Sequence, residues 1–301
     1  MRFPLSLSAV LLGLPVLVVA QNTSLRPPIT GVAQVLVYAS NMAQARHFYG
    51  TFLGLPESGT THQRYRVNAN QAVEVDPLPR GVANHLEAVA FATADAEALR
   101  RYLLVQRIDV PDSVKRRADG AQWFWVKDPE GHRIEFVQLA VHARYMPVAT
   151  HATEEPISSH ILHAGFVVRD RAAEDHFFRD VLGFHEGWQG GMKDKQVDWV
   201  DMQVPNGTDW IEYMIHGPGP ITPALSGVLN HFALGVPNMH EAMELLEQRG
   251  WHSTAREKAQ IGRDGKWQLN LYDPDGTRVE LMELRPVQIP CCSPYTLPAP
   301  K

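Results

Sequence analysis

The sequence predicts an α+β protein made of two tandem domains, because a hairpin motif and an order of elements both occur twice. The motif is Asp273 to Glu280, whose Asp-Pro-Asp-Gly start suits a type I turn and whose second strand carries Glu280. Its counterpart runs from Asp128 to Glu135. Each half of the chain also follows the order strand, helix, strands, and repeats it once.

The first half contains the following predicted elements. A strand at Gln34 to Ala39 precedes a helix at Ala43 to Leu53, which Gly54 ends, and strands near 65–67 and 72–75. The order restarts with a strand at 85–92, a helix at 94–105 and strands at 121–126 and 133–139.

The second half repeats this order after a segment without apolar periodicity. Its expected elements are a strand at 163–168, a helix at 172–182, strands at 197–204 and 209–215, a strand at 231–236, a helix at 239–248 and the hairpin strands. We therefore predict domains at 30–140 and 158–286, a linker at 141–157 and a Pro-rich tail at 287–301.

Composition limits the classes of partner. A net charge of -5 without a basic block argues against nucleic acid or an acidic membrane as partner, and 45% hydrophobic content gives each domain a core. Residues Met1 to Ala20 resemble a cleaved export signal, which predicts a secreted or periplasmic protein beginning near Gln21. An uncleaved membrane anchor is the alternative, and after cleavage no membrane association is expected.

The chain has two cysteines, Cys291 and Cys292, both in the tail. Neighbours in sequence cannot link distant parts of a core. A vicinal or intermolecular disulfide, or an exposed metal-binding pair, is possible, but we expect a structurally inert tail.

Aligning the halves places ligand-capable side chains at repeated positions. Four pairs correspond, with offsets that change only in loops: Gln34 and His163, Glu74 and Glu212, His85 and His231, and Glu135 and Glu280. Two imidazoles and two carboxylates from four strands would form a mixed nitrogen and oxygen site for a divalent transition ion such as Zn, Ni, Fe or Mn. We therefore predict a metal site at His163, Glu212, His231 and Glu280.

Two alternatives to this metal site stay open. A single strand His is more often a hydrogen-bonded core residue than a ligand, so the prediction depends on the repetition. Gln34, Glu74, His85 and Glu135 form a possible second metal site, although an amide is a weaker ligand.

With these motifs, both halves resemble the vicinal oxygen chelate superfamily, which includes glyoxalase I, extradiol dioxygenases and bleomycin resistance proteins. The resemblance lies in the strand-to-Phe-Tyr or Phe-Phe-to-Leu-Gly blocks, the Asn-His pairs ending at His85 and His231, and the two hairpins. It implies paired βαβββ modules whose curved mixed sheets form a cup around a metal.

Glyoxalase I is the most similar member by its ligand set, which implies a lyase or isomerase acting on a small oxygen-bearing substrate. In that case Glu280 is the catalytic base and Glu212 stands opposite. The Arg and Asn with which glutathione-binding members hold that thiol are replaced by Val167 and His216. A glutathione substrate is therefore not expected.

Two other functions remain. Extradiol dioxygenases would use His163, His231 and Glu280, but their catalytic Tyr position falls at Asn270 and no His occurs between His252 and Glu280. A metal-free binding protein of the resistance type is the third. We expect a small-molecule substrate, a monomer or homodimer, and modules paired consecutively because the linker is short.

Overall fold

The structure, a computed structural model, describes residues 25–58, 63–82, 85–140, 154–217 and 219–300. The predicted export signal and most of the predicted linker lie outside these ranges. Within them, no helix is both long and apolar enough to cross a membrane.

Described residues of the first half form one eight-stranded mixed sheet in the order β2-β3-β4-β1-β5-β8-β7-β6. Its strands are β1 (Ile29–Ala39), β2 (Glu57–Ser58), β3 (Gln63–Arg66), β4 (Ala72–Pro77), β5 (Leu86–Thr93), β6 (Lys115–Arg116), β7 (Gln122–Lys127) and β8 (Arg133–Gln138).

The second half repeats this sheet in the order β10-β11-β12-β9-β13-β16-β15-β14. Its strands are β9 (His160–Val168), β10 (His185–Gly190), β11 (Trp199–Gln203), β12 (Trp210–Ile215), β13 (His231–Val236), β14 (Gln260–Ile261), β15 (Trp267–Tyr272) and β16 (Arg278–Glu283). Each sheet contains both modules of its own half, so the modules pair consecutively. The predicted duplication and α+β class are confirmed.

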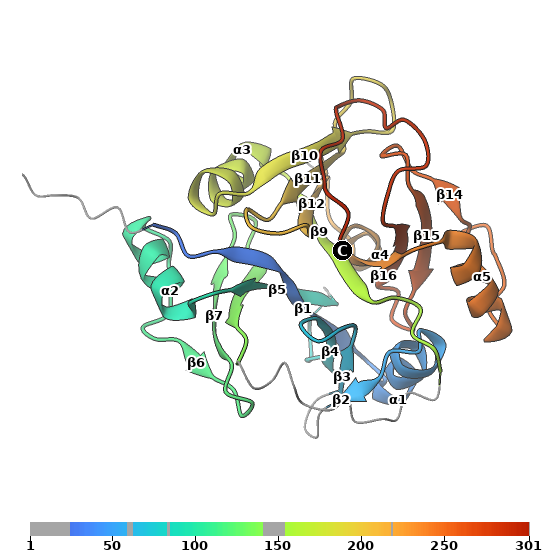
Figure 1. Ribbon diagram of the computed structural model, residues 1–301, viewed down its shortest axis with the longest axis horizontal. Coiled ribbons are helices and arrows are strands. Elements are labelled where there is room, and N and C mark those ends of the chain that lie inside the picture. Colours follow the sequence, from blue (N-terminus) through green and yellow to red (C-terminus); the bar gives the residue numbers. More distant parts are fainter. Residues whose placement is uncertain (1–24, 59–62, 83–84, 141–153, 218, 301) are drawn as a thin grey trace, which may run out of the picture.

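Helices lie beside the strands of each sheet (Figure 1). In chain order they are α1 (Met42–Arg46) with the π-helix η1 (His47–Phe52), α2 (Ala96–Val105), α3 (Arg171–Asp175) with the π-helix η3 (His176–Val181), α4 (Pro223–Leu229) and α5 (Met239–Gln248). The sequence analysis missed β10, α4 and the two-residue strands β2, β6 and β14. It also predicted uninterrupted helices where a short α-helix changes into a π-helix; Leu53 N–H, for example, bonds to the carbonyl of Phe48, five residues back.

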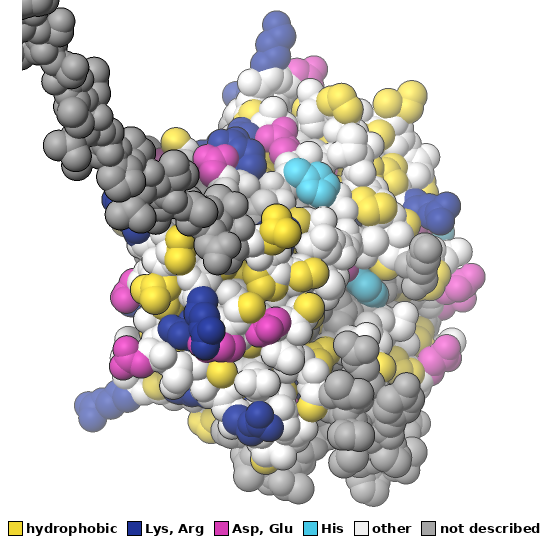
Figure 2. All heavy atoms as spheres, turned by 60° about the vertical axis from the view of Figure 1, so that its left-hand side comes forward, with side chains coloured by type: hydrophobic (Ala, Val, Ile, Leu, Met, Phe, Trp, Pro, Cys, Tyr) yellow, Lys and Arg dark blue, Asp and Glu magenta, His cyan; other side chains and the backbone are white. Residues whose placement is uncertain are grey.

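The two domains contact each other through their Asp-Pro turns in a nearly symmetric way. The backbone N–H of Ser40, just before α1, donates a hydrogen bond of 2.9 Å to Asp275 in the second turn. Glu130 of the first turn accepts from the backbone of Arg169 and Asp170, just before α3. Apolar residues from the convex sides of both sheets form one continuous core, which leaves each concave face free to hold a site. On the face in Figure 2, charges of both signs lie side by side.

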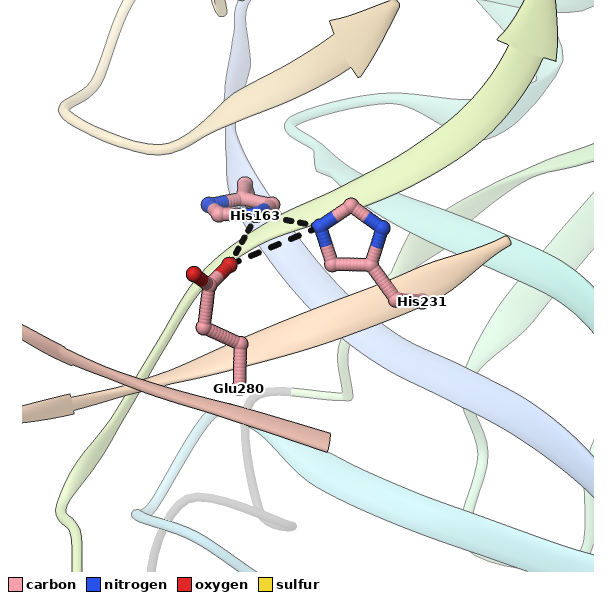
Figure 3. Close-up of side chains that lie close together, drawn as sticks. All are labelled: His163, His231 and Glu280. Atoms are coloured by element: carbon pink, nitrogen blue, oxygen red, sulfur yellow. Dashed lines mark hydrogen bonds and ion pairs between the residues drawn. The ribbon is translucent and has the colours of Figure 1, made fainter. Parts of the chain in front are cut away.

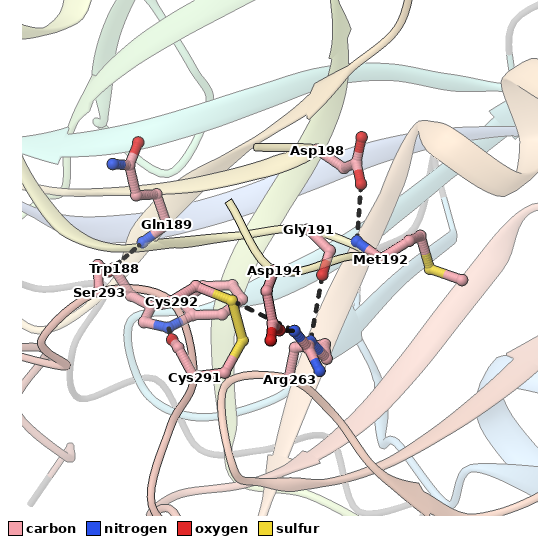
Figure 4. Close-up of a disulfide and its surroundings, with 10 residues drawn as sticks. All are labelled: Trp188, Gln189, Gly191, Met192, Asp194, Asp198, Arg263, Cys291, Cys292 and Ser293. Carbon is pink, nitrogen blue, oxygen red and sulfur yellow. Dashed lines mark hydrogen bonds and ion pairs between the residues drawn. A yellow bond between two sulfur atoms is a disulfide. The ribbon is translucent and has the colours of Figure 1, made fainter. Parts of the chain in front are cut away.

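The C-terminal tail is not inert, so that prediction is wrong. Cys291 and Cys292 form a disulfide with each other, the vicinal alternative, and the carbonyl of Cys291 accepts a bond of 3.0 Å from the indole of Trp188 (Figure 4). Cys291 N–H bonds to the carbonyl of Arg263. The tail therefore links β10 to the turn between β14 and β15 and closes one side of the second cup.

Candidate metal centre in the second domain

His163 and His231 meet on the concave face because their strands are neighbours. β9 and β13 run antiparallel, with His163 opposite Ala233 and His231 opposite Gly165. A Cβ at position 165 would lie 2.2 Å from the His231 ring, so Gly165 leaves the room that this imidazole occupies. The two Nε2 atoms approach to 3.0 Å.

Glu280 and Glu212 reach the same point from the strands on either side. Glu280 Oε2 lies 3.5 Å from His163 Nε2 and 3.6 Å from His231 Nε2 (Figure 3). Glu212 Oε2 lies 3.0 Å from His231 Nε2 and 3.8 Å from His163 Nε2. The four side chains proposed from the sequence therefore converge in a single cup.

The surroundings of the histidines suit a divalent transition ion. The Nδ1–H of His231 donates to the carbonyl of Leu229, 2.8 Å away at the end of α4, which fixes the tautomer and leaves Nε2 as a ligand atom. His163 is fully buried against Trp210, and burial lowers its pKa and favours the neutral imidazole. The two Nε2 atoms face each other at 3.0 Å, a distance that suits a shared proton or two ligands of one bound cation.

The carboxylates of this cluster are held in their ionised form. Burial alone would raise the pKa of Glu280, but hydrogen bonds to His163 and His231 outweigh it and hold that pKa well below the usual range. Ligand atoms of His163, His231 and Glu280 all lie within 4.8 Å of one another, as a mononuclear site requires. This donor set, with Glu212 beside it, fits a divalent metal ion.

A cavity of about 320 Å³ opens from the ligands toward solvent. Trp188, Trp199, Met192 and Met282 line it together with Glu212 and Glu280, so a small molecule would meet apolar walls and the ligand carboxylates. Asp264 also lines the cavity, and burial raises its pKa to about 7. Lys266, buried behind the cavity, has its ammonium 4.7 Å from the ring centre of Trp210.

The first cup differs from the predicted second metal site. Gln34, Glu74 and Glu135 do converge, but Ala88 takes the place of the second histidine: it pairs with Arg133 as His231 pairs with Arg278. His85 lies three residues earlier, before β5 begins. The alignment of His85 with His231 is therefore wrong, and His85 does not join the cluster.

Arginine side chains fill the first cup instead. Arg117 donates 2.8 Å to Gln34 Oε1, and Arg64 donates to Glu74. Arg133 lies 2.7 Å from Glu135. The sequence reasoning overlooked these cations, although strand alternation could have placed Arg64 and Arg133 on the same face as the glutamates.

Comparisons with known proteins agree with this architecture. Residues 31–136 and 162–269 each match a family model described as the Glyoxalase/Bleomycin resistance protein/Dioxygenase superfamily. No curated protein matches the chain.

Solved structures with the same fold include ring-cleaving enzymes. An extradiol ring-cleaving dioxygenase from B. fuscum matches with a TM-score of 0.63 and 21% identity, over 91% of this chain and 76% of that one. The 2,3-dioxygenase LapB from Pseudomonas sp. KL28 matches with a TM-score of 0.63 and 16% identity, over 90% and 97%. With two family matches that span most of the two sheets, the chain belongs to the Glyoxalase/Bleomycin resistance protein/Dioxygenase superfamily.

Proposed function

We propose that the protein is a metal-dependent lyase or isomerase whose site is the second cup. The observation that carries the proposal is the convergence of Glu212 as well as Glu280 on the two histidines. A bound divalent ion would act as a Lewis acid on a substrate carbonyl and make a neighbouring C–H more acidic.

The chain itself supplies the proton transfer. Glu212 and Glu280 both line the cavity, so either carboxylate can face a carbon held between them. In the proposed mechanism Glu280 removes the proton and Glu212, on the opposite side, returns one to the neighbouring carbon. Trp188 and Trp199 give the cavity apolar walls.

Proton exchange tests this function without knowledge of the natural substrate. The full-length protein, loaded with Zn²⁺ or Ni²⁺, should catalyse exchange of the hydroxymethyl protons of hydroxyacetone in D₂O, followed by proton NMR. Glu280→Gln should abolish the exchange and keep the fold, whereas Glu135→Gln in the first cup should not reduce it. Equal exchange by wild type and Glu280→Gln would contradict the proposal.

An extradiol dioxygenase is the second candidate, because His163, His231 and Glu280 form a set of two histidines and one carboxylate. One structure of similar fold is a homoprotocatechuate 2,3-dioxygenase from Brevibacterium fuscum with 3,4-dihydroxyphenylacetate (TM-score 0.63, 18% identity, 85% of this chain and 81% of that one). Among the described residues that line the cavity there is neither His nor Tyr to act as acid or base. Oxygen uptake by the Fe²⁺-loaded protein with this catechol would favour the dioxygenase.

We also propose export, from residues Met1 to Ala20 alone. Mass spectrometry of the protein recovered outside the cytoplasm should find a chain that begins near Gln21. A cytoplasmic chain that starts at Met1 would contradict this proposal.

A further inference from the structure

Arg278 lies in the second cup with an unusual lack of partners. Its side chain is 12% exposed, and its nearest recorded carboxylate oxygen, on Glu212, is 4.0 Å from Nη2. The other contact of Nη2 is the sulfur of Met214 at 4.0 Å. Within the described part of the chain, its buried Nε has no hydrogen-bond partner. A guanidinium in this state retains most of its capacity to bind an anion.

The equivalent residue of the first domain shows what Arg278 has lost. Arg133 forms an ion pair of 2.7 Å with Glu135 and lies 3.8 Å from Glu87. It also lies over the ring of Trp125, at 5.5 Å. Arg133 is therefore neutralised within its own domain.

In the second domain the corresponding partners are turned away or replaced. Glu280, the counterpart of Glu135, points to His163 and His231. Asn270, the counterpart of Trp125, pairs with Glu280 in the sheet as Trp125 pairs with Glu135. Once a metal takes the carboxylates of Glu212 and Glu280, Arg278 has no carboxylate of its own chain within ion-pair distance among the described residues.

Arg278 lines the same cavity as the ligands, so its side chain borders the space where a substrate would bind. Asn270 lines it too, and its buried Oδ1 is a second polar atom without a partner among the described residues. The guanidinium of Arg278 can pair with an anionic oxygen, and Oδ1 of Asn270 can accept a hydrogen bond from a hydroxyl group. Both side chains lie beside the same metal site.

We infer that the second cup takes a small 2-oxygenated acid, and that Arg278 binds its carboxylate while Asn270 accepts from its hydroxyl group. This inference rests on the proposed metal site and adds a substrate class to it. Arg278 acts here as a substrate-binding residue, and the acid binds as its anion. The carboxylate of the substrate lies beside the substrate oxygens that would bind the metal, because Arg278 is next to the ligand Glu212.

Glycolate and glycolamide test this inference, since they have the same shape and differ in one charged oxygen. Each would be titrated into the full-length Co²⁺-loaded protein, with the visible cobalt spectrum as the readout. Wild type should bind glycolate far more tightly than glycolamide. In Arg278→Gln the affinity for glycolate should fall about 10-fold to 100-fold while that for glycolamide changes little, because a charge-assisted hydrogen bond is lost.

Two further variants make the result specific. Arg278→Lys keeps the charge and should retain much of the preference for glycolate. The matched substitution Arg133→Gln, at the same position of the first cup, should leave both affinities unchanged. The inference alone would be overturned if the ratio of the affinities for glycolate and glycolamide in Arg278→Gln stayed within about twofold of the wild-type ratio. A protein that binds no Co²⁺ would overturn the proposed function as well.

Discussion

The two cups have the same fold, but the side chains that line them differ in charge. Opposite Glu74 in the first sheet stands Arg64, whereas Asp201 stands opposite Glu212 in the second. Arg117 begins the turn that follows β6, and Gly262 begins the same turn of the second domain, as their matching backbone bonds show. In the second cup, Asp201 and Gly262 stand where the first cup has arginines, and both line the cavity beside the metal ligands.

This difference shows that one fold can hold a cup with paired histidines and a cup filled by arginines. A cup lined by glutamates needs positive charge, because ionised carboxylates are costly to bury unpaired. The second cup can receive this charge from an exchangeable ion, whereas guanidinium groups supply it permanently in the first. The first domain then stabilises the fold and carries half of the common core.

Removal of a histidine from the second cup gives the largest expected effect. Wild-type protein should bind one divalent ion per chain, and His231→Ala should weaken this binding more than about 100-fold because one ligand and its fixed tautomer are lost. Gln34→Ala in the first cup is the matched control and should leave the metal content unchanged. Elemental analysis after dialysis measures both; two ions per chain, or a loss with Gln34→Ala, would contradict the assignment.

The next prediction concerns the first helix of each domain. Glu174 in α3 and Ala45 in α1 occupy equivalent positions, each four residues after the N-cap of its helix. Burial, with the nearby charge of Asp128, raises the pKa of Glu174 to about 9. Between pH 4.5 and about 9 the folded protein holds a proton that the unfolded chain releases, so the free energy of unfolding falls as pH rises.

Glu174→Gln should remove this contribution, which amounts to about 1.4 kcal/mol per pH unit at most. Stability at pH 7 should therefore increase, and its pH dependence should become flatter. Urea unfolding at several pH values measures this, with the exposed Glu247→Gln on α5 as control. An unchanged pH dependence in Glu174→Gln would show that the buried carboxyl is already ionised in the folded protein.

A smaller loss is expected from Arg117→Ala in the first cup. It removes the guanidinium 3.6 Å from both Glu74 and Glu135, while Arg64 and Arg133 keep one carboxylate each. Because Arg117 is partly exposed, we expect a loss of about 1–3 kcal/mol in the free energy of unfolding. The surface pair of Arg46 and Glu57 provides the control, since Arg46→Ala should cost less than about 1 kcal/mol. No loss with Arg117→Ala would mean that the cation is dispensable to the cup.

The sequence allowed much of this structure to be predicted, because repetition compensates for weak individual signals. A single strand histidine says little, but His163, Glu212 and Glu280 have ligand-capable counterparts at repeated positions of the other half, and strand alternation gives their common face. Strand alternation puts Arg278, two residues before Glu280, on that face as well. Its missing partners could not be foreseen, since they depend on which way Glu280 turns.

The wrong match of His85 with His231 arose where the two halves differ in loop length. An Asn-His pair precedes both strands, which suggested that His85 matches His231. Backbone pairing shows otherwise, because the second half has room for α4 before His231 and the first half begins β5 directly after His85. The tail was misjudged for another reason: its contacts are backbone and indole hydrogen bonds to β10 and to Arg263, which leave no periodic pattern.

The smallest expected effect comes from the C-terminal tail, which is also a feature that distinguishes the second domain from the first. Cys291→Ser with Cys292→Ser removes a link between adjacent residues, which restricts the unfolded chain very little. The hydrogen bonds to Trp188 and Arg263 use the backbone of Cys291 and remain available. We therefore expect a change below about 1 kcal/mol in urea unfolding.

By contrast, Leu297→Ala in the same tail should cost more. Leu297 is buried, and its side chain occupies the space that a Cβ on Gly187 would fill. Removal of a buried leucine costs about 2–5 kcal/mol in a well-packed core, and the lower part of this range is expected for a segment near the chain end. If the double serine variant were instead the less stable of the two, the disulfide rather than the packing of Leu297 would hold the tail across the second cup.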